Sequence, residues 1–223
     1  MLPECVELAT GPKPEAAIIW LHGLGADGHD FEPLVPELAP FLPCDVRFVF
    51  PHAPMRALTV NGGMPMRAWY DIVAFDRHAP QDEAGMRQTD AAIQALIARE
   101  SARGIDASRL VLAGFSQGGA MILYSGVRLD VPVAGLLALS CYLLEPARLT
   151  AARQAQSARA PVFLAHGNAD EVLPLAYGEQ ARDALLAAGY SVEWHRYRMG
   201  HGVAPEEIGD IGRWLQRRLG AGP

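Results

Sequence analysis

The sequence predicts an α/β fold with a mostly parallel central sheet that helices cover on both faces. Short apolar runs alternate with segments of helical periodicity, a pattern that parallel strands joined by crossover helices produce. The 223 residues suit one domain, and no internal repeat or interdomain linker divides them. A composition of 50% hydrophobic and 20% charged residues is ordinary for a globular protein. Functional groups are therefore expected at the carboxyl ends of the strands.

The N-terminal part is expected to form strand, helix and strand, followed by a loop region. The elements are strands at 16–21 and 46–50 and a helix at 30–38 that Asp30 would cap. Residues 53–80 are expected to be an irregular, lid-like region, because prolines and Asn61-Gly62-Gly63 interrupt long regular elements. The apolar side chains of this region argue against disorder.

The rest of the chain is expected to repeat the alternation of helix and strand. A long helical pattern over 83–103 should end at Gly104. The further expected strands are 109–113, 135–140, 162–165 and 192–197, and the further expected helices are 120–127, 175–188 and 206–219. The segment 147–160 is too short to separate two domains and is expected to be a surface helix or loop.

Charge and cysteine content argue against several kinds of partner. The formal charge of -6 and the scattered basic residues disfavour nucleic acid or an anionic membrane surface. Cys5, Cys44 and Cys141 suggest neither a disulfide framework nor a zinc site, so they are expected to be reduced thiols. The first fifteen residues do not resemble a signal peptide, and no apolar stretch is long enough to span a bilayer. A cytoplasmic protein without stable membrane insertion is therefore expected.

The pentapeptide Gly114-Phe115-Ser116-Gln117-Gly118 lies between an expected strand and an expected helix. A G-x-S-x-G sequence in this position is typical of a sharp turn that exposes a serine nucleophile. Such a turn needs small residues two positions before and two positions after the serine, and Gly114 and Gly118 meet that need. The alternative is an ordinary glycine-rich turn, which becomes less favoured once partners for Ser116 are found.

A serine hydroxyl needs a base to accept its proton and an acid to orient that base. When the serine lies on such a turn, the partners follow in the order Ser, Asp or Glu, then His, each on a loop after a strand. Asp170 follows the expected strand 162–165, and His201 follows the expected strand 192–197. The sequence therefore favours Ser116, Asp170 and His201 as catalytic residues.

Other residues compete for two of these roles. Glu171 is adjacent to Asp170 and could supply the acid, while Asp170 could instead cap a local turn. Among the seven histidines, His195 lies inside an expected strand and His166 at a strand end. His201 is the favoured base because its two glycine neighbours give a loop that can bring the imidazole to the serine.

Attack on a carbonyl develops negative charge on oxygen, so the site also needs preorganised N–H donors. The N–H of Gln117, directly after the serine, is one expected donor. The glycine-rich loop after strand 16–21 offers the other, at Leu24. Gly23 and Gly25 would equally suit a simple tight turn, which is the alternative interpretation of this loop.

Several segments together carry a resemblance to a known family. They are His22-Gly23-Leu24-Gly25, Trp69-Tyr70-Asp71, Gly114-Phe115-Ser116-Gln117-Gly118-Gly119-Ala120, His166-Gly167 with Asp170, and Met199-Gly200-His201 with Pro205-Glu206-Glu207-Ile208. Over nearly the whole chain they resemble the bacterial carboxylesterase and lysophospholipase group related to acyl-protein thioesterases. The resemblance implies one α/β-hydrolase domain over residues 1–223 without a large cap, the Ser116, Asp170 and His201 triad, and oxyanion donors at Leu24 and Gln117. It also implies no metal or organic cofactor and is compatible with a homodimer.

The expected function is a serine hydrolase that cleaves carboxylic esters or thioesters with apolar acyl groups through an acyl-enzyme. Its substrate would be a small ester, a thioester, or an acylated lipid or peptide. Met64, Trp69 and Phe75 of the lid-like region are expected to contact the acyl group, since ligand pockets are mostly apolar. The alternative is a catalytically silent protein of the same fold that binds acylated partners; a third class is a docking protein.

Overall fold

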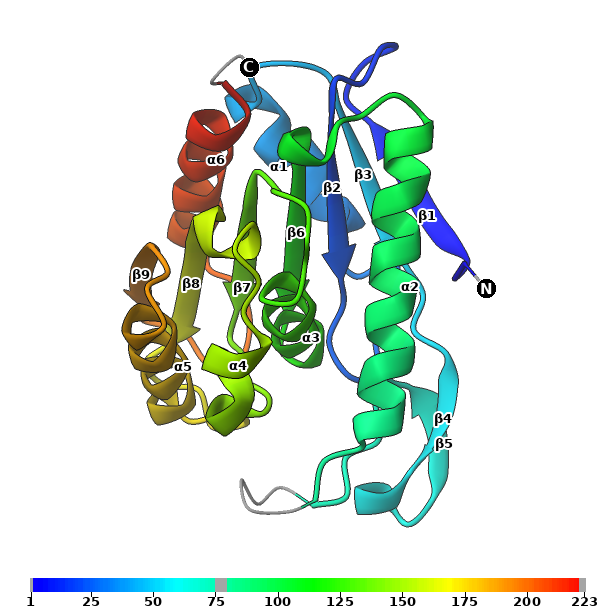
Figure 1. The fold of residues 1–223 in the computed structure, drawn as a ribbon, viewed down its shortest axis with the longest axis vertical. Helices are drawn as coiled ribbons and strands as arrows, with labels where there is room; N and C mark the ends of the chain where they lie inside the picture. The colour runs from blue at the N-terminus through cyan, green and yellow to red at the C-terminus, as the bar shows by residue number, and fades with distance from the viewer. Residues whose placement is uncertain (1, 75–79, 221–223) are drawn as a thin grey trace.

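A computed structural model describes residues 2–74 and 80–220, and its centre is a seven-stranded sheet (Figure 1). In chain order the strands are β1 (Cys5–Ala9), β2 (Ala16–Leu21), β3 (Val46–Pro51), β6 (Leu110–Phe115), β7 (Gly135–Leu139), β8 (Val162–Gly167) and β9 (Val192–Tyr197). Their order across the sheet is β1-β3-β2-β6-β7-β8-β9. The pair of β1 and β3 is antiparallel, and the other adjacent pairs are parallel. The prediction of a mostly parallel sheet is confirmed.

Helices cover both faces of this sheet (Figure 1). The α-helices are α1 (Val35–Leu38), α2 (Glu83–Ala102), α3 (Gln117–Gly126), α4 (Leu149–Ala152), α5 (Leu175–Ala187) and α6 (Pro205–Gly220). Successive side chains of a strand point to opposite faces. Ile19 and Leu21 of β2 therefore join the core cluster with α2, α3 and α5, while Ile18 and Trp20 join the cluster with α1 and α6. Burial on both faces accounts for the continuous apolar sequence of this strand.

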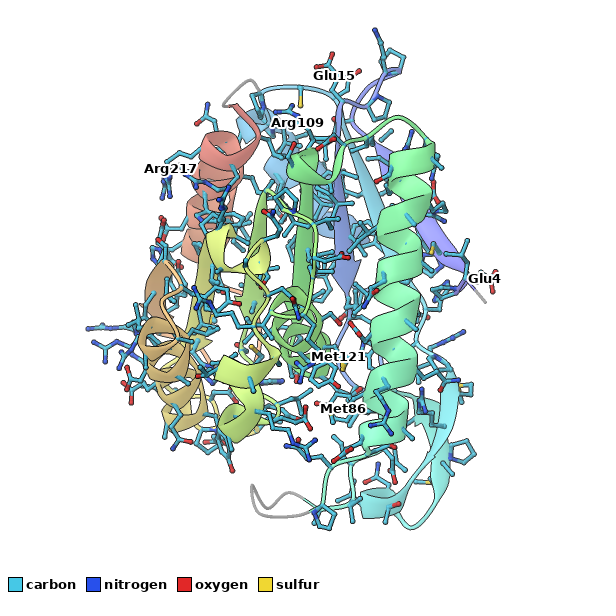
Figure 2. The ribbon with its side chains drawn as sticks, in the orientation of Figure 1. Glu4, Glu15, Met86, Arg109, Met121 and Arg217 are labelled. Atoms are coloured by element: carbon cyan, nitrogen blue, oxygen red, sulfur yellow. The ribbon has the colours of Figure 1, made fainter. Side chains whose placement is uncertain are left out.

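Helix α2 has clear signals at both ends. The Asp82 side chain accepts a hydrogen bond from the Gly85 N–H at 2.9 Å, and Gly104 follows the last turn with φ of 90°. Figure 2 shows Met86 of α2 and Met121 of α3 in the layer between the two helices, where both are fully buried. The expected helix over 83–103 and its stop at Gly104 are confirmed.

The prediction of a single helix over residues 30–38 is wrong. The segment is divided into a 3₁₀ turn (Glu32–Leu34), α1, and a second 3₁₀ turn (Ala39–Phe41). Asp30 does not cap a helix, because the first turn has no side-chain cap. Pro33, Pro36 and Pro40 explain the division, since none of them has an N–H to donate to a helical hydrogen bond.

Part of the lid-like region is regular, which corrects the expectation of irregular structure. β4 (Met55–Leu58) and β5 (Met64–Arg67) form an antiparallel hairpin, and a 3₁₀ turn (Thr59–Asn61) connects them. Gly62 and Gly63 follow that turn with φ of 65° and 82°. These left-handed conformations suit glycine, so the two residues reverse the chain rather than only interrupting it.

Smaller differences concern the ends of elements. Strand β1 was not expected from the sequence, whereas β6 extends to Phe115 and α3 begins directly after Ser116. Segment 147–160 contains α4 between short 3₁₀ turns (Pro146–Arg148 and Ser157–Arg159). The three cysteines are free thiols. Across residues 2–74 and 80–220, no helix is long and apolar enough to cross a membrane.

Candidate active site

Ser116 lies at the sharp turn between β6 and α3. Its backbone has φ of 53° and ψ of −118°, a conformation that non-glycine residues seldom adopt. The Ser116 N–H donates to the Leu139 carbonyl at 2.9 Å, which attaches the turn to the end of β7. The strained turn is therefore held by the sheet, and it raises the serine at the carboxyl ends of the strands.

The two glycines of the pentapeptide are required by close backbone packing. A Cβ atom added to Gly114 would lie 2.5 Å from the Gly118 carbonyl carbon. One added to Gly118 would lie 2.4 Å from the Leu21 carbonyl oxygen and 2.6 Å from that of His22. Because these obstacles are backbone atoms, no side-chain movement can remove them. The small residues expected on both sides of Ser116 are thus a geometric necessity.

The structure brings Ser116, His201 and Asp170 together in one hydrogen-bonded chain. His201 Nε2 lies 2.9 Å from Ser116 Oγ, and His201 Nδ1 lies 2.7 Å from Asp170 Oδ2. With Nδ1–H donating to the carboxylate, Nε2 is left as the acceptor for the serine hydroxyl. The His201 side chain is 16% exposed and that of Asp170 is fully buried, so the base is reachable while the acid is shielded.

Local hydrogen bonds hold the acid and base loops in place. Asp170 Oδ1 accepts from the N–H groups of Val172 at 3.0 Å and Leu173 at 2.7 Å. The Ala169 N–H donates to the Met199 carbonyl at 3.1 Å, which joins the loop after β8 to the loop after β9. The adjacent Glu171 is exposed and makes no bond to the imidazole. The geometry therefore favours Asp170 over Glu171 as the partner of His201.

His166 is a second histidine beside the carboxylate. Its Nε2–H donates to the Leu173 carbonyl at 2.7 Å and lies 3.5 Å from Asp170 Oδ2. The side chain is fully buried, and burial lowers the pKa of His166, so the ring is held neutral. His166 therefore supports the acid loop through its bond to the Leu173 carbonyl.

Leu24 and Gln117 lie on the two segments beside Ser116. A Cβ atom added at Gly23 would lie 3.5 Å from Ser116 Cβ, so the loop after β2 passes next to the serine. Gln117 is the first residue of α3, where a backbone N–H has no helical acceptor. Among the described residues, the N–H of Leu24 also donates to no acceptor. Both N–H groups are thus free to bind an external oxygen.

The three apolar residues expected to contact substrate have different placements. Met64 is 63% exposed on the hairpin, whereas Trp69 is only 2% exposed and lies beneath the loop after β2. Phe75 lies outside the described residues. A cavity of about 560 Å³ borders Trp69 beside α2, but the triad residues do not line it. Met64 and Trp69 are therefore not brought together into one apolar surface at Ser116.

The sequence did not indicate the contacts of the Trp69, Gln117 and His22 side chains. The Trp69 indole N–H donates to the His22 carbonyl at 2.9 Å, and the Trp69 main-chain N–H donates to Gln117 Oε1 at 2.8 Å. His22 Nδ1 lies 2.7 Å from the Gly23 carbonyl oxygen. The two Trp69 bonds join residues far apart in the chain, so no local pattern could have predicted them.

The parallel sheet and a serine, histidine and aspartate joined in this way at its carboxyl edge define an α/β-hydrolase. No cap domain is present in residues 2–74 and 80–220. No group of three or more His, Cys, Asp or Glu in the described part of the chain could hold a metal ion. The chemistry of the site is that of nucleophilic acyl transfer.

Comparison with known proteins gives the family. The Phospholipase/Carboxylesterase family matches residues 4–219, so the chain belongs to that family and is a hydrolase of the esterase and thioesterase class. Acyl-protein thioesterase 1 of Neurospora crassa is 40% identical over 213 residues, which are 92% of this chain and 87% of that protein. Acyl-protein thioesterase 1 of Mycosarcoma maydis is 40% identical over 228 residues, 95% of each chain.

Solved structures agree with this assignment. The crystal structure of Zea mays acyl-protein thioesterase 2 has a TM-score of 0.86 and 30% identity, over 97% of this chain and 99% of that chain. The esterase PE8 has a TM-score of 0.83 and 27% identity, over 98% and 100% of the two chains. The expected relation to acyl-protein thioesterases is confirmed. The two sequence relatives are fungal, so the narrower bacterial group finds no support in them.

Proposed function

We propose that this protein hydrolyses thioesters and esters of apolar acyl groups through an acyl-enzyme on Ser116. The hydrogen-bonded chain from Ser116 through His201 to Asp170 is the observation that carries the proposal. Ser116 Oγ attacks the acyl carbonyl carbon while its proton passes to His201 Nε2. The leaving thiolate or alkoxide then takes that proton, and water repeats the sequence to release the acid and restore the serine. Asp170 keeps the imidazole in the required tautomer and stabilises its charge.

The N–H groups of Leu24 and Gln117 are the proposed oxyanion hole. Each lies on a segment next to Ser116, and each lacks an acceptor among the described residues. An oxygen that gains negative charge as the tetrahedral intermediate forms would bind both donors more strongly than the ground-state carbonyl does. The two backbone groups therefore supply the charge stabilisation that a cofactor-free hydrolase needs.

The proposed physiological substrate is an S-acylated protein. The proteins of Neurospora crassa and Mycosarcoma maydis that are 40% identical over most of this chain are both named acyl-protein thioesterases. We propose further that the chain acts as one domain in the cytoplasm and that residues 53–80 serve as a lid beside the acyl group. Met64 on the hairpin is one of the exposed apolar side chains of this region, together with Met55 and Val73, that a substrate could meet directly.

A fluorophosphonate probe tests the nucleophile. The native protein should be labelled and the Ser116→Ala variant should not, because the probe forms its bond with an activated serine oxygen. Equal labelling of both proteins would refute Ser116 as nucleophile. Turnover of a short p-nitrophenyl ester separates hydrolysis from the alternative of a catalytically silent binding protein, which would bind the ester and release no nitrophenol.

A substrate profile tests the acyl donor. Values of kcat/KM should be measured side by side for an S-acylated peptide, acyl-CoA, lysophospholipid and p-nitrophenyl esters of increasing chain length. The proposal expects the S-acylated peptide to be preferred, and a preference for lysophospholipid would overturn the assignment of substrate while leaving the triad intact. Size-exclusion chromatography with light scattering tests the homodimer that the resemblance allows.

A further inference from the structure

Trp69 is hydrogen-bonded to both segments that carry the proposed oxyanion donors. Its indole Nε1–H donates to the His22 carbonyl at 2.9 Å, at the end of β2. Its main-chain N–H donates to Gln117 Oε1 at 2.8 Å, and Gln117 Nε2 donates to the Tyr70 carbonyl at 2.8 Å. One buried residue is thus bonded both to the loop of Leu24 and to the first residue of α3.

The Trp69 backbone is itself fixed. Its carbonyl accepts a hydrogen bond from the Thr89 hydroxyl on α2, and its side chain is almost fully buried. The Gln117 side-chain amide accepts from the Trp69 N–H and donates to the Tyr70 carbonyl, so it binds the peptide groups on both sides of the Trp69–Tyr70 link. A residue held at its carbonyl, N–H and side chain has little freedom to move, so it can serve as a rigid connection.

The His22 carbonyl is the point where this connection meets the loop. Its oxygen accepts a hydrogen bond from the Trp69 indole. The same oxygen lies so near α3 that a Cβ atom added to Gly118 would be 2.6 Å away. The end of β2 is therefore pressed against the first turn of α3. Loss of the indole donor would leave a buried carbonyl without its partner and allow the two segments to separate.

The His22 side chain then fixes the direction of the Leu24 N–H. Burial lowers the pKa of His22 to about 4, so the ring is neutral near pH 7. Its Nε2 accepts from the Ala53 N–H at 3.0 Å, which leaves Nδ1–H to donate to the Gly23 carbonyl at 2.7 Å. The Gly23 carbonyl and the Leu24 N–H belong to one trans peptide and point in opposite directions. Holding the carbonyl therefore orients the donor.

We propose that Trp69 is a positioning residue, which keeps the N–H groups of Leu24 and Gln117 at the spacing that the tetrahedral intermediate requires. This role rests on the proposed function of the same site. It replaces the contact with substrate that the sequence suggested for Trp69. The competing interpretation is that Trp69 is only a core aromatic residue whose bonds serve stability.

The two interpretations differ in their kinetic consequences. A displaced oxyanion donor weakens binding in the transition state more than in the ground state, so kcat falls while KM changes little. A purely structural role lowers the amount of folded protein but leaves the kinetics of each folded molecule unchanged. Kinetic constants should therefore be normalised to the concentration of active sites, titrated with a fluorophosphonate.

The decisive variant is Trp69→Phe, which keeps an aromatic side chain and removes the N–H donor. Trp194→Phe is the matched control, because the buried Trp194 Nε1 has no hydrogen-bond partner among the described residues. For p-nitrophenyl butyrate we expect Trp69→Phe to lower kcat about 10- to 100-fold with KM within about twofold. Its affinity for butylboronic acid, which forms a tetrahedral adduct with the serine, should fall by a similar factor.

A second variant tests the other end of the connection. Gln117→Met removes the side-chain amide and keeps the main-chain N–H, and it should also lower kcat with little effect on KM. Because both changes release the same connection, the double variant should lose less than the product of the two single losses. If Trp69→Phe does not fold, the kcat of Gln117→Met alone tests the positioning role.

The proposal is overturned if kcat of both variants stays within about twofold of the Trp194→Phe value. It is also overturned if kcat/KM falls only because KM rises. Its failure is distinguishable from failure of the proposed function. Persistent fluorophosphonate labelling of Ser116→Ala would refute the nucleophile, whereas unchanged kcat of the Trp69 and Gln117 variants would refute only the positioning role.

Discussion

The Glu207→Gln substitution is expected to stabilise the protein above pH 5. Glu207 lies in the first turn of α6, directly after the loop that carries His201, and its side chain is fully buried. Oε2 accepts from the Ala204 N–H at 3.2 Å, while Oε1 has no hydrogen-bond partner in the described residues. Burial raises the pKa of Glu207 from 4.5 to about 8, so the folded protein keeps this carboxyl protonated at neutral pH.

The sign of the pH dependence follows from the number of protons bound in each state. Between about pH 4.5 and about pH 8 the unfolded chain has lost the Glu207 proton and the folded chain retains it. The unfolded state therefore binds fewer protons, and the free energy of unfolding decreases as pH rises through this interval. At 1.36 kcal/mol per pH unit, this one group removes about 3 kcal/mol of stability between pH 4.5 and pH 7.

Glutamine keeps an oxygen for the Ala204 N–H and cannot ionise. The difference in free energy of unfolding between Glu207→Gln and the native protein should therefore grow from pH 4.5 to pH 7 by about 3 kcal/mol in favour of the variant. Urea denaturation followed by circular dichroism at half-unit pH intervals measures this difference, in which the other titrating groups largely cancel. A difference that stays flat over this range, or that grows in the opposite direction, would refute the reasoning.

Three further predictions concern the site and the core. Asp170→Asn should lower kcat/KM by about 10⁴-fold in a steady-state assay, because the imidazole loses the partner that fixes its tautomer. In the same assay, kcat/KM of Glu171→Gln should stay within about twofold of the native value. A larger loss at Glu171 would reverse the choice of acid. Gly118→Ala should cost about 1–3 kcal/mol of stability in thermal denaturation and also lower kcat, because the new Cβ would lie 2.4 Å from the Leu21 carbonyl oxygen. Stability and kcat equal to those of the native protein would contradict the packing of the turn. Phe163→Ala removes a fully buried ring and should lower the free energy of unfolding by about 3–5 kcal/mol in urea, and a loss below about 1 kcal/mol would be incompatible with its burial.

The elements with strong local signals were predictable from the sequence. Helix α2 has a capping Asp82 and a terminating Gly104, and β2 is an uninterrupted apolar run. The helix expected over 30–38 does not form as one element, because Pro33, Pro36 and Pro40 have no N–H to donate to helical hydrogen bonds. Strand β1 could not be found locally, since its pairing with β3 joins residues that are 38 to 46 positions apart in the chain.

The candidate site shows a similar division. The order Ser116, Asp170, His201 follows from chain topology, because each residue comes after a strand of one parallel sheet. The choice between Asp170 and Glu171 depends on side-chain direction, which adjacent positions in a loop do not reveal. Trp69 shows the same limit, since an aromatic residue in a loop region can face a ligand or the core, and only tertiary packing decides which.

The backbone of Ser116 restricts which amino acids could ever serve at this turn. A branched β-carbon is strongly disfavoured at φ of 53°, whereas an unbranched one is tolerated. Replacement of the attacking oxygen by sulfur, in a cysteine, is therefore open to this scaffold. Threonine, although it carries the same hydroxyl, is closed to it, so the chemistry available to descendants of this protein is limited by a torsion angle before any question of reactivity arises.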